Sequence, residues 1–537
     1  MVVEVVGSEG DKKTRLEEQD GGEATEPRNK LGLSDGTLIL ISMAIGFISH
    51  AYNMFRYPIY LGDEGIYMEQ AWSLIQLGKL SPYTYFYDHA PAGWMLIAGW
   101  IYLLPARFHQ FGMAINSGRV LMLLLHVISV ALLYKVAKKL SGSDTAAFLT
   151  ALIFSLSPLG LYYQRMVLLD NIMVFWLLMS LYFLTYNNGR LTNVLISGLL
   201  FGIALLTKEN AVFFLPVMAY MVYLEVKNTY RYRFGLTGWV FAWSAVLSFY
   251  PLYAFLKSEL LPAGTSFILS SSPVEHVSLV QTWLWQLSRR NSSILDLNSQ
   301  FWVFFNLRWW PRDAFIIGGG IFAVLVNFWI GLNNRTRYGG NFLAALLAMA
   351  YGFYIIRGSV MLEFYLTPLL PFLAMNAAML IDLIINALSE QLRVVVYVLG
   401  VLLLSSAFIY TARDHYTLNI TQEQVAQLQW IRTNIPPSAK IAIDDDLWVD
   451  LHDQVGRAPV FPYAHSHWKV QGDPDIREKL LHDNWRNLDY IVLSDDLLQN
   501  MERENTEDFM LTAIRNSRPV AQFEKGDVLV QIRKVNK

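Results

Sequence analysis

The stretch that decides the fold is GTLILISMAIGFISHAYNMF (residues 36–55), which is soon followed by YLGDEGIY (residues 60–67). The first part has the length of a membrane-spanning helix, which needs about 20 mostly apolar residues. The second part places two adjacent carboxylates, Asp63 and Glu64, where that helix leaves the membrane. Because ionisable groups at such positions are costly to the fold, we expect this pair to take part in chemistry.

The composition of the 537-residue chain is that of a polytopic membrane protein. Hydrophobic residues make up 54% and charged residues 16%, and the mean hydropathy is +0.32. Soluble domains contain about 25% charged residues. The net charge of −2 argues against a nucleic-acid partner. The chain has no cysteine, which excludes disulfides, thiolate nucleophiles and zinc–thiolate sites.

The apolar stretches predict about eleven membrane-spanning helices. With a cytoplasmic N-terminus, every cytoplasmic connection is basic, as the positive-inside rule requires. The rule leaves the apolar stretch Pro91 to Leu104 outside the count, as a helix at the outer surface. The predicted spans lie near residues 36–57, 117–138, 145–163, 169–187, 192–207, 209–226, 236–256, 313–333, 341–356, 364–387 and 393–411.

We predict three regions in a multi-pass protein of the plasma membrane. Residues 1–34 are a polar, mixed-charge tail, which we expect to be disordered in the cytoplasm. Residues 35–411 form the transmembrane catalytic region, with external loops at 59–116 and 257–312. Residues 412–537 have the composition of a soluble α/β domain, which the topology places outside the cell.

Several shorter elements are also expected outside the membrane. The Trp- and Phe-rich segments Leu279 to Leu287 and Phe301 to Trp310 suit helices that lie in the membrane interface. In the C-terminal region, one helix and three strands are predicted from the residue patterns. The helix lies near Gln422 to Thr433, and the strands lie near residues 440–443, 488–493 and 528–532.

The ionisable residues of the membrane region collect at the external ends of the spans. A secondary transporter is expected to carry polar groups or broken helices near the membrane midplane, whereas this pattern predicts one polar cavity at the outer leaflet. Its members are Asp63, Glu64, Glu69, Asp88, His89, Arg119, Arg165, Asp170, Lys208, Glu209, Glu259, Arg357 and Glu363.

Three basic residues in this set, Arg165, Lys208 and Arg357, oppose the positive-inside trend. They stand where a lipid phosphate would lie, and cationic side chains bind phosphate oxygens well. We therefore predict that they bind the phosphate of a lipid-linked donor. The alternative is that they snorkel or form local ion pairs, namely Lys208 with Glu209, Arg357 with Glu363 and Arg165 with Asp170.

Several motifs follow one another along the chain: GDEGIY (62–67), YDHAPAG (87–93), RMVLLD (165–170), LTKE (206–209) and the segment from Arg357 to Pro371. In this order they resemble motifs of the GT-C glycosyltransferases of the protein O-mannosyltransferase and aminoarabinose transferase type. The first two resemble the first external loop of that family, RMVLLD its second external loop, LTKE its Leu-Thr-Lys turn, and the last segment its late Arg-, Tyr- and Pro-containing span. The chain has His-Ala-Pro where the family has His-Pro-Pro, and the first loop lacks the Asp-x-Asp motif of the metal-dependent oligosaccharyl branch.

The resemblance implies transfer of a sugar from a polyprenyl or dolichyl monophosphate to an acceptor hydroxyl, with inversion at the anomeric carbon. Such transfer needs a carboxylate as general base and positive charge at the leaving phosphate. We assign the base to Asp63 and further catalytic roles to Glu64 and Asp170. Asp170 would orient the acceptor, a metal or a cationic neighbour. The alternatives are a helix-dipole role for Glu64 and an N-cap role for Asp170.

We assign substrate contacts to His89, Tyr67, Glu209 and Tyr365. No cofactor is assigned with certainty, and a divalent metal ion stays open. The expected partners are the lipid-linked donor, membrane lipids and an acceptor that is a protein, a lipid or a glycan. Two functions from other classes also stay open: a flippase or transporter of lipid-linked sugars, and a non-catalytic membrane scaffold.

Overall fold

The computed structural model describes residues 33–186, 188–228, 232–262, 265, 277–289, 292–358, 360–494, 509–525 and 528–537. Nearly all of the predicted N-terminal tail therefore lies outside the described residues. The predicted external loop 257–312 is described only in part.

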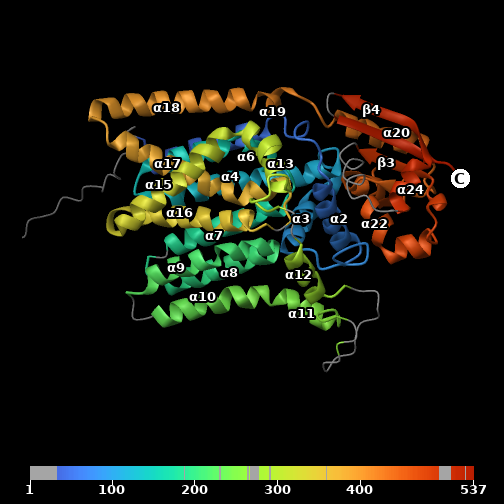
Figure 1. The fold of residues 1–537 in the computed structure, drawn as a ribbon, viewed down its shortest axis with the longest axis horizontal. Coiled ribbons are helices and arrows are strands. Elements are labelled where there is room, and N and C mark those ends of the chain that lie inside the picture. Colours follow the sequence, from blue (N-terminus) through green and yellow to red (C-terminus); the bar gives the residue numbers. More distant parts are fainter. Residues whose placement is uncertain are drawn as a thin grey trace, which may run out of the picture.

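A bundle of apolar helices forms the larger part of the molecule, and its long helices run roughly along one direction (Figure 1). Seven described helices are long and apolar enough to cross a membrane, and five shorter ones are also apolar. Each predicted span coincides with helical structure, so the polytopic helical class is confirmed. The bundle helices are α1 (Asp35–Ala51), α4 (Ala114–Ser141), α5 (Asp144–Leu156), α6 (Pro158–Tyr163), α7 (Leu169–Thr185), α8 (Leu191–Thr207), η2 (Glu209–Phe214), α9 (Leu215–Val226), α10 (Tyr232–Leu247), α11 (Phe249–Leu256), η4 (Phe315–Gly319), α15 (Gly320–Asn333), α16 (Arg335–Ile356), η5 (Glu363–Leu369), α17 (Leu370–Asn386) and α18 (Glu390–Thr411).

Small residues let the bundle helices pack closely. On α8, Gly198 and Gly202 are one turn apart, and a Cβ atom at either would lie 2.8 Å from a backbone oxygen of α10, at Trp239 and Trp243 respectively. Without a hydrophobic force between helices in lipid, such close backbone contact is a main source of helix association. It fixes α8, and with it the turn that follows α8.

The C-terminal region contains a five-stranded sheet of order β2-β1-β3-β5-β4. Strands β2, β1 and β3 pair in parallel, whereas β5 pairs antiparallel with both β3 and β4. Three strands overlap the predicted ones, and β2 and β4 were not predicted. The elements are α19 (Arg413–Thr417), α20 (Gln422–Asn434), β1 (Ile441–Ile443), η6 (Asp445–Leu447), α21 (Trp448–His452), β2 (Ala464–Ser466), α22 (His467–Gly472), η7 (Asp475–Leu480), η8 (Trp485–Asn487), β3 (Tyr490–Ser494), α24 (Phe509–Arg515), β4 (Ser517–Lys525) and β5 (Val528–Val535).

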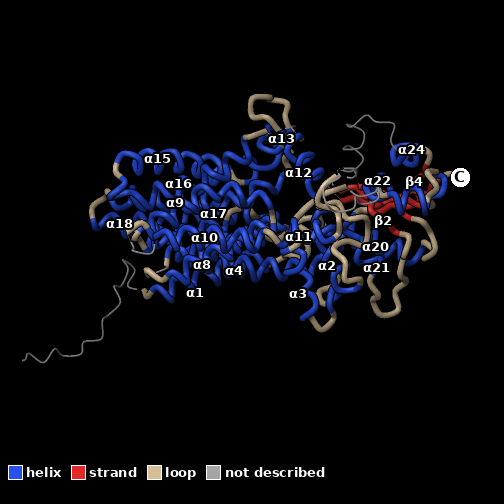
Figure 2. The backbone as a smooth tube through the Cα atoms, turned by 90° about the horizontal axis from the view of Figure 1, so that it is seen from below, coloured by secondary structure: helices blue, strands red, loops and turns tan. Residues whose placement is uncertain are grey.

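Several short helices lie between the bundle and the sheet, at what we call the sheet end of the bundle (Figures 1 and 2). The segment Pro91 to Leu104 forms the separate helix α3, as expected. Helix α2 begins at Gly62, so that Asp63 and Glu64 lie in its first turn. These elements are α2 (Gly62–Gln76), α3 (Ala92–Leu103), η1 (Arg107–His109), α12 (Leu279–Ser288), α13 (Gln300–Phe304), η3 (Phe305–Trp309) and α14 (Trp310–Arg312).

Helix α2 packs directly against the C-terminal region. A Cβ atom at Gly65 would overlap the backbone carbonyl of Asp445, so only glycine permits this approach. The Gln424 side chain of α20 bonds both backbone groups of Tyr60, with both distances 2.9 Å, and it donates to Asp446 at 2.8 Å. The start of α2 is therefore fixed from the side of the sheet.

We expect Gly65→Ala to destabilise the protein, since the added methyl group must push α2 away from the backbone of Asp445. Overpacking of this kind costs about 1–3 kcal/mol. The measurement is the thermal unfolding midpoint in detergent. The control is Gly99→Ala on α3, where a Cβ atom would meet nothing within 4 Å. Equal midpoints for the two variants would contradict the contact.

Candidate active site

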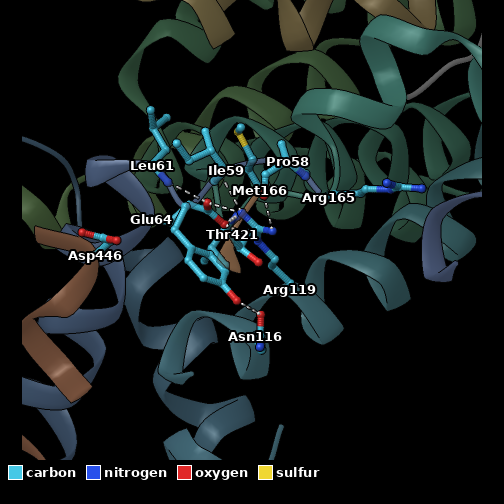
Figure 3. A network of polar contacts seen from close by, with 12 residues as sticks. Pro58, Ile59, Leu61, Glu64, Asn116, Arg119, Arg165, Met166, Thr421 and Asp446 are labelled. Carbon is cyan, nitrogen blue, oxygen red and sulfur yellow. Dashed lines mark hydrogen bonds and ion pairs between the residues drawn. The ribbon is translucent and has the colours of Figure 1, made fainter. Parts of the chain in front are cut away.

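The Glu64 carboxylate lies at the centre of a buried polar network at the start of α2 (Figure 3). Arg119 of α4 donates to both of its oxygens, from Nε at 2.9 Å and from Nη2 at 2.7 Å. The backbone N–H groups of Val167 and Leu61 also donate to it, at 2.9 and 3.1 Å. Both side chains of the ion pair are fully buried. Glu64 therefore has four donors and no exposed oxygen.

Arg119 extends this network to the segment that joins α1 to α2. Its Nη1 donates to the carbonyls of Met54 and Pro58, at 3.0 and 2.9 Å, and its Nη2 donates to that of Ile59 at 3.0 Å. The geometry therefore gives Glu64 a role in the fold, and the catalytic role expected from the sequence stays a prediction. The sequence shows that Asp63 and Glu64 are adjacent, but it does not show that Arg119 of α4 neutralises Glu64.

Arg165 was predicted to bind a phosphate, but its guanidinium is used inside the protein. Its side chain donates to the carbonyls of Ser49 and Tyr52, at 2.7 and 3.0 Å, and to those of Tyr57 and His415, both at 3.2 Å. It is only 2% exposed. The expected pairing with Asp170 is not formed, because Asp170 pairs with Lys208 instead.

The Asp170–Lys208 pair joins the first turn of α7 to the turn after α8. Lys208 Nζ lies 2.5 Å from Asp170 Oδ2, and the two side chains are 3% and 0% exposed. The same ammonium lies 4.4 Å from the ring centre of Tyr365, which contributes a cation–π contact. Asp170 therefore holds a cationic neighbour, which is one of the roles expected for it. The alternative N-cap role does not apply, because the N-cap of α7 is Leu168.

His89 and Glu209 form a second contact beside this pair. His89 Nδ1 lies 3.5 Å from Glu209 Oε2, and the backbone N–H of Ala90 donates to Glu209 Oε1 at 2.7 Å. Burial lowers the pKa of His89, but the neighbouring Asp88 and Glu209 raise it above its usual value overall. Glu209 thus holds the His89 turn rather than pairing with Lys208.

Asp63, the predicted base, faces this cluster from the start of α2. Burial raises its pKa to about 6, against the opposing effects of Lys208 and His89. The Tyr67 hydroxyl lies 3.5 Å from Asp63 Oδ1. Asp63 thus stays half-buried with a pKa close to neutrality, as a general base requires.

Arg357 lies at the edge of the cluster. Its side chain is exposed, and its guanidinium lies 5.0 Å from the ring centres of both Phe213 and Tyr354. The Tyr354 ring is 6.0 Å from that of Tyr365, so Arg357 and Lys208 stand on one continuous group of aromatic rings. The expected partner of Arg357, Glu363, forms an ion pair with Arg308 at 3.2 Å.

A cavity of about 670 Å³ opens beside these residues. Its wall includes two predicted substrate residues, Tyr67 and His89. It also includes residues that the sequence did not single out, from α12 and from the C-terminal region. These are Trp285, Arg289, Trp468 and Lys469. Their only sequence signal is the two tryptophans of the α12 segment, Trp283 and Trp285.

Within the described parts of the chain, no group of three or more His, Asp or Glu residues could hold a metal ion. The carboxylate that was expected to meet a metal or a cation, Asp170, is neutralised by Lys208. Lys208 is thus the cationic neighbour of Asp170.

Comparison with known proteins agrees with the fold. The family model of the dolichyl-phosphate-mannose-protein mannosyltransferases matches residues 88–251, a segment that contains His89, Asp170, Lys208 and Glu209. A search of curated proteins finds no match.

Solved structures match over most of the chain. ArnT from Cupriavidus metallidurans, bound to undecaprenyl phosphate, is 14% identical with a TM-score of 0.56, over 93% of this chain and 98% of ArnT. The oligosaccharyltransferase AglB from Archaeoglobus fulgidus, in complex with an inhibitory peptide and a dolichol-phosphate, is 13% identical with a TM-score of 0.55, over 85% of this chain and 69% of AglB.

The fold is thus that of the GT-C membrane glycosyltransferases, and the resemblance seen in the sequence motifs is confirmed. The relatives found by the family match and by the structural matches are glycosyltransferases. The chain is a membrane protein, with seven described helices that are long and apolar enough to cross a membrane.

We expect Glu64→Gln to destabilise the protein strongly, because it leaves the buried Arg119 charge without its partner. Breaking a buried ion pair costs about 3–5 kcal/mol. The thermal midpoint in detergent measures the effect. The double variant Glu64→Gln/Arg119→Met removes both charges and should lose less than the sum of the two single variants. Additive losses would mean that the pair does not act as a unit.

Proposed function

We propose that this protein is an inverting glycosyltransferase that moves a sugar from a polyprenyl or dolichyl monophosphate to an acceptor hydroxyl. The observation that carries the proposal is the placement of Asp63 and Lys208 in one cluster, where they interact electrostatically. This cluster combines a carboxylate of near-neutral pKa with a fixed cation beside a large cavity. The lipid phosphates bound to ArnT and AglB support the same donor class.

In this mechanism Asp63 accepts the proton of the acceptor hydroxyl. Its carboxylate must be ionised to act, and its partial burial keeps it basic enough to do so. The hydroxyl oxygen attacks the anomeric carbon from the side opposite the phosphate, and the bond from that carbon to the phosphate oxygen breaks. The configuration at the anomeric carbon is thereby inverted.

The leaving phosphate gains negative charge as this bond breaks. Lys208 and Arg357 stand on the aromatic group formed by Tyr354 and Tyr365, and we assign them to the phosphate. Fixed cations stabilise charge that develops in the transition state without reorganising. Arg165 is left out of this set, because its guanidinium is bonded to four carbonyls.

We further propose that the protein lies in the plasma membrane with its N-terminus in the cytoplasm and its C-terminal region outside. The basic connections at the other end of the bundle support this orientation, and the cluster lies at the sheet end. The donor would then be used at the outer face. Accessibility of cysteines introduced at the two ends, labelled from outside intact cells, tests the orientation.

The transfer itself is tested with purified protein, a radiolabelled polyprenyl-phosphate sugar and candidate acceptors of the protein, lipid and glycan classes. Label in the acceptor supports the enzyme. Label that crosses the proteoliposome membrane without being transferred to an acceptor would favour a flippase or transporter. If the label neither reaches an acceptor nor crosses the membrane, whether or not the donor binds, a scaffold is favoured and the proposal is overturned.

We expect Asp63→Asn to abolish transfer and to leave donor binding nearly unchanged, because the base acts on the acceptor rather than on the carrier phosphate. In the unaltered protein, kcat/KM should be constant at neutral pH. It should fall about tenfold per pH unit below about 6, since protonation of Asp63 (pKa about 6) removes the base. Full activity of the Asn variant with saturating donor would remove Asp63 from the mechanism.

We expect Arg357→Ala to raise the KM for the donor and to lower kcat, since a charge-assisted contact is worth about 1.5–3 kcal/mol. The combined loss in kcat/KM is about ten- to a hundredfold. Arg357→Lys should restore only part of it, because an ammonium cannot form the two parallel bonds of a guanidinium. The control is Arg190→Ala, an exposed arginine outside the cluster. Equal donor kinetics for both Ala variants would show that Arg357 does not bind the phosphate.

A further inference from the structure

Asp445 belongs to the C-terminal region but lies against the start of α2. Its backbone is packed on Gly65, where no side chain would fit. Trp468 Nε1 of α22 donates to its Oδ1 at 3.0 Å. Its other oxygen, Oδ2, lies 3.5 Å from the position of a Cβ atom built on Gly62. The carboxylate is therefore held beside the residue that precedes Asp63.

Several described charged or titratable groups face Asp63. From its own helix there is Tyr67, whose hydroxyl lies 3.5 Å away. Lys208 and His89 favour the ionised form of Asp63, whereas Asp445 and Asp88 oppose it. Tyr365, on η5, also interacts with Asp63. Asp445 is the one member of this set that comes from the C-terminal region.

We propose that Asp445 is a positioning residue for Asp63, and that the C-terminal region is therefore part of the catalytic unit. The proposal rests on the assignment of Asp63 as the base. Asp445 acts through the fixed place of its carboxylate and through its charge, which disfavours a second negative charge at Asp63 and makes Asp63 a stronger base.

The charge of Asp445 is itself present near neutral pH. Burial raises its pKa to about 6, while the nearby Lys469 acts in the opposite direction. Glu69 of α2 also faces Asp445 and Lys469. Asp63 and Asp445 both titrate near this pH, and the ionisation of one disfavours that of the other. The pair should therefore titrate over a broader pH range than a single group. Removing one of them leaves a simpler titration for the other.

The test measures the protonation of Asp63 directly, without transfer. A carbodiimide reacts with protonated carboxyl groups, and peptide mass spectrometry of the full-length protein gives the labelled fraction of Asp63 at each pH. In Asp445→Asn the labelling midpoint of Asp63 should move to lower pH by roughly half a unit or more, because a like charge has been removed. Asp445→Glu should keep most of the original midpoint.

The matched control is Asp444→Asn, one residue away. Its carboxylate pairs with His467, whose Nε2 lies 3.5 Å from Asp444 Oδ1. Its substitution should leave the midpoint of Asp63 unchanged. Where transfer is measured, the acidic limb of kcat/KM should follow the labelling midpoint in each variant, and a purely structural role would not move it.

Each outcome decides one question. A shift in Asp445→Asn with none in Asp444→Asn supports the proposal, even if the unaltered protein transfers no sugar, in which case the proposed function alone fails. The proposal is overturned if Asp445→Asn is as thermally stable as the unaltered protein and leaves the labelling midpoint of Asp63 unchanged. Equal shifts in both Asn variants would also overturn it, since they would reflect general charge rather than the place of Asp445.

Discussion

The rest of the site depends on the buried ion pair between Glu64 and Arg119. Removing two charges from water is costly, and the cost is offset only when the geometry is good and the remaining hydrogen-bonding groups are satisfied. Here both conditions hold, since Glu64 has four donors and Arg119 binds three further carbonyls. Neighbouring residues of a helix point about 100° apart. Fixing Glu64 toward α4 therefore turns Asp63 toward a different side, where the cluster lies.

A second constraint acts on α2 from the opposite side. The glycine at position 65 lets the backbone of Asp445 rest on the helix, and the Gln424 side chain holds the preceding Tyr60. Near η1, His109 bridges Asp450 and Asp453 of the C-terminal region at 3.4 and 3.2 Å. The helix that carries Asp63 is thus held by both the bundle and the sheet. A catalytic group supported in this way loses little precision to loop motion.

Much of the fold could be predicted from the sequence, because long apolar stretches and basic connections report membrane spans directly. Several predicted site residues also lie together, since the structure gathers Asp63, His89, Asp170, Lys208 and Glu209 in one place. The pairing of these residues could not be predicted. Lys208 adjoins Glu209 in sequence yet binds Asp170, because the contact depends on how α7 and α8 pack. The residues of the cavity wall from the C-terminal region lacked any local periodicity that pointed to the site.

The Asp170–Lys208 pair satisfies two buried charges of the folded protein and also suits the proposed reaction. A lone buried ammonium would be costly, and Asp170 removes that cost while leaving the cation in place. Only one carboxylate oxygen of Asp170 is used, since in the described residues Oδ1 has no hydrogen-bond partner. In the proposed mechanism, that oxygen accepts a hydroxyl of the donor sugar while Lys208 faces the phosphate. The pair would then contact both the sugar and the phosphate, and the bond between them is the one that the proposed reaction breaks.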